Sequence, residues 1–204
     1  MKRKLLAISL CLVMMMTLMP MIPMTALAAN DITADFDNLI FRDAVRNAAG
    51  LGPMDSIKDT DAAKIIYLDV SNLGISSLDG IEHLVNLKFL DCSENQLSTL
   101  ELSGCSDLVQ LYCSSNQLST LDLSGCSDLV RLSCSNNQLS TLDLSGCPDL
   151  VELSCGYNQL STLDLFGFSA LEYLSCESNQ LRNRHQTNWT TFTDKSYWMH
   201  CSWK

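Results

Sequence analysis

The sequence predicts an α/β solenoid, a right-handed superhelix of stacked turns with short parallel strands and a helical cap at its N-terminal side. An eleven-residue pattern returns five times at intervals of 21 residues. Its apolar positions alternate as in a strand with one buried face. Ahead of it, residues 35–50 carry apolar side chains at helical spacing. A lone turn cannot bury such a set of side chains, so the turns must stack.

The repeats define the extent of the solenoid. Every full copy reads L-x-x-L-x-C-x-x-N-Q-L, and the copies begin at Leu87, Leu108, Leu129, Leu150 and Leu171. A variant first copy begins at Ile65, with its strand at residues 65–70. This is the leucine-rich repeat pattern, with cysteine where the third apolar residue usually stands. We therefore expect a leucine-rich repeat solenoid of about six turns over residues 65–181, the last of them incomplete.

Each turn presents a fixed set of side chains to the interior. In the second turn, these are predicted to be Leu87, Leu90, Cys92, Asn95, Leu97, Leu100, Leu102 and Cys105. Asn95 and its counterparts, Asn116, Asn137, Asn158 and Asn179, follow the strand, where the chain must bend. We expect their amides to bond backbone groups that would otherwise lack partners. The first copy has Leu73 in this place, so the ladder should begin at the second turn.

Cysteines form two rows with the same period. One row is Cys92, Cys113, Cys134, Cys155 and Cys176, and the other is Cys105, Cys126 and Cys147, with Phe168 in the next place. The favoured interpretation is buried filler, because free cysteine packs as a small apolar residue. Disulfides are a second possibility in an exported chain, although side chains on neighbouring turns run parallel and do not point at each other. A zinc site is the third, but one sulfur per turn does not converge four ligands.

Residues 29–64 are expected to form the N-terminal helical cap. In the segment 35–50 the predicted inward side chains are Phe36, Ile40, Ala44, Val45 and Ala48. Asp35 or Asp37 can cap this helix at its start, and Gly50 can end it. A second, short helix is expected within residues 56–64.

The period stops at residue 182, and residues 182–204 form an irregular tail of different composition. The tail is either a short C-terminal cap or the truncated or frameshifted end of a longer array, and the sequence leaves both open. His200 and Cys201 resemble a catalytic pair only by adjacency, because neighbouring side chains rarely meet productively. We expect no catalytic residue there.

Residues 1–28 have the features of a secretory signal peptide. A basic start at Lys2–Lys4 is followed by an apolar run, and Ala26-Leu27-Ala28 fits the cleavage rule. An uncleaved anchor is the alternative, because the run is long enough to span a bilayer. Since no second apolar span follows, we expect a secreted or cell-surface protein, cleaved near Ala28, without a membrane span in its mature form.

The excess of acidic residues bears on which class of molecule the protein can bind. The chain has 13 basic and 23 acidic residues, a formal net charge of −10. Nucleic acid is therefore not expected as a partner, because phosphate binding needs a positive field. We also expect a monomer without cofactor or metal.

The chain resembles the secreted, internalin-like leucine-rich repeat proteins of bacteria. The resemblance covers residues 35–181 and is carried by the helical cap, by the entry sequence from Leu68 to Leu84 and by the cysteine-bearing repeats. It implies a non-enzymatic module that binds a protein or glycan ligand on a host or other cell surface. Larger relatives carry wall anchors or adhesive domains after the repeats, and this sequence shows none.

A ligand would be expected on the concave face of the sheet, where repeat proteins usually bind. The candidate residues are Tyr67, Phe89, Asp91, Gln110, Tyr112, Arg131, Glu152 and Tyr173. Phe89, Tyr112 and Arg131 are predicted to form the centre, because aromatic and arginine residues are frequent interface anchors. The competing interpretation is strand filling, since aromatic residues also favour strands.

Two other functions remain possible. The chain could be a fragment of a larger surface protein, or an accessory domain of a secreted enzyme. Catalysis within the repeats is disfavoured, because a repeat places like groups in rows and a catalytic site needs unlike groups together. One such row, Asp122, Asp143 and Asp164 with Glu101 in register, is expected to face solvent. A calcium role for it is weak, because single carboxylates per turn rarely complete the shell.

Overall fold

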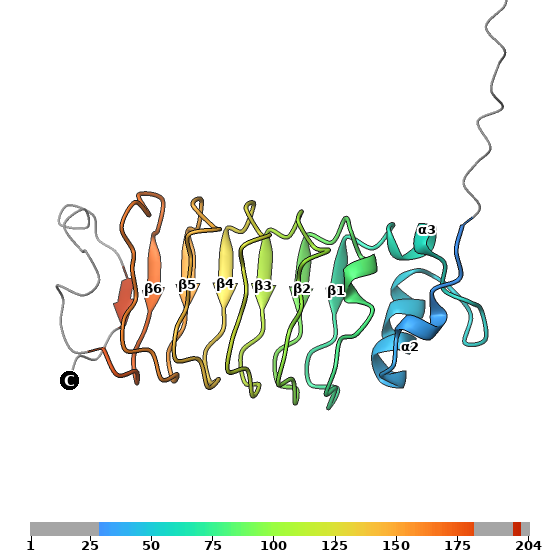
Figure 1. The fold of residues 1–204 in the computed structure, drawn as a ribbon, viewed down its shortest axis with the longest axis horizontal. Helices are drawn as coiled ribbons and strands as arrows, with labels where there is room; N and C mark the ends of the chain where they lie inside the picture. Colours follow the sequence, from blue (N-terminus) through green and yellow to red (C-terminus); the bar gives the residue numbers. More distant parts are fainter. Residues whose placement is uncertain (1–28, 182–197, 201–204) are drawn as a thin grey trace, which may run out of the picture.

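A computed structural model describes residues 29–181 and 198–200 and shows a row of stacked turns with helices at one end (Figure 1). The strands are β1 (Tyr67–Asp69), β2 (Phe89–Asp91), β3 (Gln110–Tyr112), β4 (Arg131–Ser133), β5 (Glu152–Ser154), β6 (Tyr173–Ser175) and β7 (Trp198–His200). They pair in parallel and in sequence order. The predicted solenoid of short parallel strands is confirmed.

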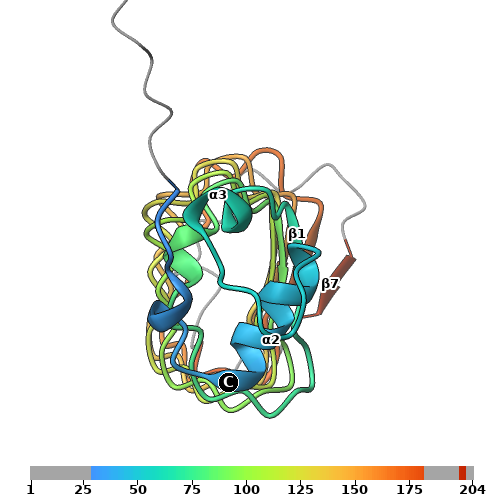
Figure 2. The same ribbon diagram turned by 90° about the vertical axis from the view of Figure 1, so that its right-hand side faces the viewer.

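Strands occupy one side of the stack. Seen along the long axis, the turns superimpose, with the strands in one wall and α2 and α3 across the near end (Figure 2). Residues 21 apart are partners in the sheet, for example Gln110 with Arg131 and Tyr112 with Ser133. Side chains of one repeat position therefore line up as columns along the solenoid.

The interior consists of leucine and cysteine rows from successive turns. All eight inward positions predicted for the second turn are buried. The asparagine ladder also forms as predicted and begins at Asn95. In the next turn, Asn116 Oδ1 accepts a hydrogen bond from the Leu97 N–H (2.9 Å). Asn116 Nδ2 donates to the carbonyl oxygen of Cys92 (2.9 Å), so each amide joins two turns.

A left-handed backbone residue precedes each asparagine of the ladder. These residues are Glu94, Ser115, Asn136, Tyr157 and Ser178, with φ between 53° and 57°, and Asn72 has the same conformation in the first turn. Side-chain-bearing residues rarely adopt this conformation, and asparagine tolerates it best among them. The bend after each strand is therefore a point of local strain.

The N-terminal cap differs in detail from its prediction. Helix α2 spans Leu39–Ala48 and is preceded by η1 (Thr33–Asp35). Asn38 caps α2, because its side chain accepts hydrogen bonds from the N–H groups of Ile40 and Phe41. Asp35 and Asp37 were therefore the wrong choice of cap.

The buried stripe of α2 is also shifted from the predicted one. Phe41 and Val45 face the core, whereas Ile40 is exposed and was wrongly placed inside. Ala48 is exposed as well. Phe36 is buried as predicted, but it lies before the helix. Gly50, with φ of 71°, follows the end of α2 as expected.

Two further short helices complete the cap region. Helix α3 spans Asp59–Ala62, within the segment predicted as helical. The turn η2 (Ile81–His83) packs beside the cap, and His83 Nε2 lies 2.8 Å from Asp35 Oδ2. This contact ties the first repeat to the residues ahead of α2. Within the described residues, no helix has the length and apolarity needed to cross a membrane.

Strand β7 was not anticipated from the sequence. Trp198–His200 pairs in parallel with Tyr173–Ser175, so the sheet extends one strand past the last recognisable repeat. The predicted signal peptide lies outside the described residues, as do Cys201 and most of the C-terminal tail.

Candidate binding surface

Side chains that alternate with the inward ones form the outward face of the sheet, which we call the strand face. Its first column is Tyr67, Phe89, Gln110, Arg131, Glu152 and Tyr173, aligned by the register of β1 to β6. Its second column is Asp69, Asp91, Tyr112, Ser133, Ser154 and Ser175. All eight candidate residues therefore share one face, as the strand period requires.

An aromatic cluster occupies the end of the strand face nearest the cap. The rings of Tyr67 and Phe89 are stacked, with centroids 4.3 Å apart and planes 11° apart. The ring of Tyr112 is tilted by 44° against Phe89 at 5.5 Å. Tyr67 is 57% exposed despite these contacts. Since buried aromatic clusters normally stabilise cores, an exposed one is a candidate contact surface.

Two carboxylates stand beside the aromatic cluster. Asp69 and Asp91 are in-register partners on β1 and β2. Asp69 Oδ1 accepts hydrogen bonds from the N–H (3.0 Å) and the hydroxyl (2.7 Å) of Ser71. Asp91 Oδ1 accepts a hydrogen bond from the Ser93 N–H (2.9 Å). Asp91 was predicted as a site residue, but Asp69 was not named among those candidates.

The structure separates Arg131 from the aromatic cluster. Gln110 stands between Phe89 and Arg131 in the first column, and Arg131 Nε lies 3.0 Å from Glu152 Oε1. The ion pair neutralises the guanidinium, and both side chains are about two-fifths exposed. The predicted centre of Phe89, Tyr112 and Arg131 is thus divided into an aromatic part and a paired polar part.

In the far half of the strand face the second column consists of Ser133, Ser154 and Ser175, while the first column keeps the large side chains Arg131, Glu152 and Tyr173. The hydroxyls of Ser114 and Ser133 lie 2.8 Å apart. Near β6, Ser175 Oγ donates to Glu177 Oε2 (2.6 Å), and the Glu177 carboxylate lies over Gly156. The second column therefore carries small hydroxyl side chains in the far half, whereas Asp69, Asp91 and Tyr112 occupy it at the end nearest the cap.

Carboxylates on the opposite side of the solenoid have a structural role. Asp122 Oδ1 accepts the Ser124 N–H (2.9 Å), Asp143 Oδ1 accepts the Ser145 N–H (2.9 Å), and Asp164 binds the Phe166 N–H in the same way. These backbone bonds lower the pKa of Asp122 and of Asp143. They face solvent as predicted, but each also closes a turn. No group of histidine, cysteine or acidic side chains in the described residues is arranged to hold a metal ion.

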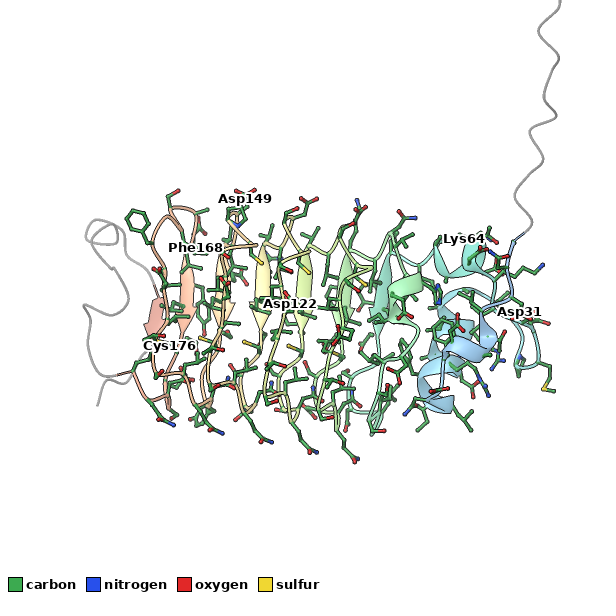
Figure 3. All side chains as sticks on the ribbon, viewed as in Figure 1. Asp31, Lys64, Asp122, Asp149, Phe168 and Cys176 are labelled. Carbon is green, nitrogen blue, oxygen red and sulfur yellow. The ribbon has the colours of Figure 1, made fainter. Side chains whose placement is uncertain are left out.

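The two cysteine rows lie at opposite ends of the strands. Figure 3 shows this through Cys176, in the first row, and Phe168, which follows the second. Seven described cysteines are buried free thiols, whereas Cys176 is disulfide-bonded. Burial raises the pKa of Cys134 and of Cys147 to about 12. Such thiols are poor nucleophiles because the thiolate is the reactive form. The seven free thiols therefore act as packing residues, as the favoured interpretation expected, whereas that interpretation is wrong for Cys176, where the disulfide alternative applies.

Comparison with known families and structures agrees with this architecture. The family model described as Leucine Rich repeats (2 copies) matches residues 85–125 and 127–167. No curated protein sequence matches the chain.

Solved structures of two proteins from Listeria monocytogenes are similar over most of the chain. The functional domain of InlJ, described as including a cysteine ladder, has 29% identity and a TM-score of 0.66, covering 76% of this chain and 39% of that one. The internalin InlF has 21% identity and a TM-score of 0.75, covering 87% of this chain and 55% of that one. The chain thus spans about two-fifths and just over half of these two structures.

Proposed function

We propose that this chain, an internalin-like leucine-rich repeat protein, is an exported, non-enzymatic module that binds a protein ligand on a host or other cell surface through its strand face. The coarse part of this statement, a protein-binding repeat module, follows from the repeat family and from the solved neighbours. The ligand, the export and the face are the proposal.

One observation carries the proposal: the first column of the strand face is the most variable position of the eleven-residue pattern. The first column holds five different residue types in the five regular turns, namely Phe89, Gln110, Arg131, Glu152 and Tyr173. The asparagine at each bend and the glutamine that directly follows this asparagine are the same in all five turns. A surface that only had to remain soluble would not need this variety, whereas recognition of an irregular partner does.

Export is supported by the sequence and by the neighbours. Residues 1–28 have the basic start, apolar run and small-residue exit of a signal peptide. The resemblance to internalin-like proteins, which implies a secreted or surface location, agrees with that interpretation. Edman sequencing of the secreted protein from a bacterial host tests the cleavage, and the mature protein should begin near Ala29.

The binding proposal is tested with a panel of extracellular proteins and surface glycans immobilised on a sensor. Wild-type protein is compared with a Phe89→Ala/Tyr112→Ala variant of the strand face. A Thr120→Ala/Thr141→Ala variant is the matched control, because both threonines are exposed in the segment that leads to the opposite side. We expect a ligand that binds wild type and control, and that loses about tenfold or more in affinity for the strand-face variant.

Two results would contradict the proposal. Equal affinity of a captured ligand for the wild type and the strand-face variant would move the binding surface elsewhere. A ligand that is lost only by the threonine variant would place recognition on the opposite side. Circular dichroism of all three proteins establishes that each retains its fold, since the substituted side chains are not fully buried.

A further inference from the structure

We infer that the end of the strand face nearest the cap binds arginine side chains of an extended, basic segment of the partner. This inference rests on the proposed function and adds the chemistry of the partner. The residues that carry it are Asp69, Asp91, Tyr67, Phe89 and Tyr112, which we call the acidic–aromatic patch.

Asp69 and Asp91 form a pair of like charges without a basic partner. Asp69 and Asp91 are direct partners on neighbouring strands, about 4.8 Å apart by strand spacing. Like charges directly opposite each other destabilise a sheet. Among the ion pairs of the described residues, neither carboxylate has a basic partner. Each uses Oδ1 for a serine two residues later, which leaves Oδ2 available to a ligand.

The fold does not need carboxylates in the second column of the strand face. The three later turns have serine there, at Ser133, Ser154 and Ser175, with the same strand pairing. The repulsive pair is therefore a feature of this end alone. It coincides with the aromatic rings of Tyr67 and Phe89, which the first column replaces with the polar side chains Gln110, Arg131 and Glu152 in the next three turns, before Tyr173.

The aromatic rings of the acidic–aromatic patch present their edges, and not their faces, to a ligand. Rings on adjacent strands that stack at 4.3 Å and 11° must stand on edge above the sheet. The faces that Tyr67 and Phe89 turn toward each other are covered, so they cannot serve as a flat platform for a sugar ring. The ring edges instead suit a narrow aliphatic stem. Arginine combines such a stem with a planar fork that matches carboxylates, and it is weakly hydrated.

The neighbouring basic groups leave the patch acidic. Lys88 is exposed and directly precedes Phe89 in the chain, whereas Asp91 follows Phe89 by two residues. Arg131 is paired with Glu152 and lies beyond Gln110. One lysine beside two carboxylates leaves a net negative patch, and the formal charge of −10 favours the approach of a basic partner.

The test uses a fluorescein-labelled tetra-arginine peptide and fluorescence anisotropy on the mature protein. Asp69→Asn/Asp91→Asn removes both charges and keeps the oxygen that each serine N–H needs, so the turns are preserved. The matched control is Asp122→Asn/Asp143→Asn. The two control residues are 21 residues apart, against 22 for Asp69 and Asp91. They bond serine N–H groups in the same way and undergo the same change of charge, away from the strand face.

We expect affinity for tetra-arginine to fall about tenfold in the Asp69/Asp91 variant and to change less than about twofold in the control. The Phe89→Ala/Tyr112→Ala variant should also bind more weakly, and tetra-lysine should bind wild type less well than tetra-arginine does. Equal losses in both aspartate variants would show non-specific attraction and overturn the inference. Equal affinity for the two peptides would overturn the assignment to arginine.

Failure of the inference is distinguishable from failure of the proposed function. If tetra-arginine does not bind wild type, the inference is wrong. The proposed function would still stand if a ligand from the sensor panel requires Phe89 and Tyr112 but is insensitive to the aspartate substitutions. If neither peptide nor panel ligand depends on any strand-face residue, both statements fail.

Discussion

The side-chain amide of Asn116 bonds the backbone of Cys92, 24 residues earlier, across the boundary between two turns. The same residue accepts the N–H of Leu97, and it also donates to the carbonyl oxygen of Cys113 (3.2 Å). One buried amide thus joins the bend of its own turn to the turn before it. Repetition of this arrangement makes the stack a chain of neighbour-to-neighbour bonds.

Asn116→Ala should therefore lower the free energy of unfolding by about 2–4 kcal/mol, because buried backbone groups of Leu97 and Cys92 lose their partner. The control is Gln117→Ala, which changes an exposed side chain in the same bend and should stay within about 0.5 kcal/mol. Urea denaturation followed by circular dichroism measures both. Equal midpoints for the two variants would contradict the structural role of the ladder.

Glycines at one repeat position should respond differently to alanine. A Cβ at Gly104 would collide with the backbone of Glu82, whereas a Cβ at Gly125 would meet nothing within 4 Å. Gly104→Ala is expected to lower the melting temperature, with a loss of about 1–3 kcal/mol from overpacking. Gly125→Ala should be neutral or stabilising by up to about 1 kcal/mol. Similar melting temperatures for both variants would contradict this difference.

Tyr157 occupies the left-handed bend position with φ of 53° and is 54% exposed. Asn72 and Asn136 occupy the same position in other turns. Tyr157→Asn should stabilise the protein by roughly 0.5–1 kcal/mol, because asparagine adopts this conformation more readily. The reverse change, Asn136→Tyr, should destabilise by a similar amount. Chemical denaturation of both variants checks the two signs.

Stability should fall at alkaline pH because buried thiols resist ionisation in the folded protein. Burial raises the pKa of Cys134 from 9.0 to about 12. Above pH 9 the unfolded chain loses this proton while the folded chain keeps it, so the unfolded state gains stability as pH rises toward 12. The contribution is complete below pH 9 and is lost between pH 9 and 12.

Urea titrations at several pH values measure this effect. Cys134→Ala should reduce the slope of the free energy of unfolding against pH by up to about 1.4 kcal/mol per pH unit between pH 9 and 12. The variant also loses packing contacts, but that loss shifts the whole curve and does not change its slope. An unchanged slope would contradict burial of the thiol.

The repeats made the solenoid predictable, because their period places the same residue types at the same structural positions. Leu90, Cys92 and Asn95 could be assigned to the interior from alternation and spacing alone. The cap was less certain. Asp35, Asp37 and Asn38 lie close together before α2 and can all cap a helix, although only the two aspartates were predicted to do so. The choice among them depends on how the helix packs against the first turn. Hence Asn38 caps α2, and the core is contacted by Phe41, one position after Ile40, the residue predicted to face inward.

The candidate surface was predictable as a set of columns, but its divisions were not. Strand alternation put Phe89, Tyr112 and Arg131 on one face. Side-chain rotamers, which no spacing rule supplies, then joined the aromatic rings and turned Arg131 toward Glu152. The local role of Asp122 in its turn has a sequence signal, an aspartate two residues before a serine.

Because the turns stack in register, positions along the strand face are separated by whole numbers of repeats. Each repeat of 21 residues adds one strand, so the loss or duplication of one repeat moves Tyr173 relative to Phe89 by about 4.8 Å. Every type of interior contact stays unchanged. Excision of residues 108–128 would place Arg131 directly beside Phe89. Gain or loss of whole repeats can therefore change which side chains contact a ligand while the fold stays the same.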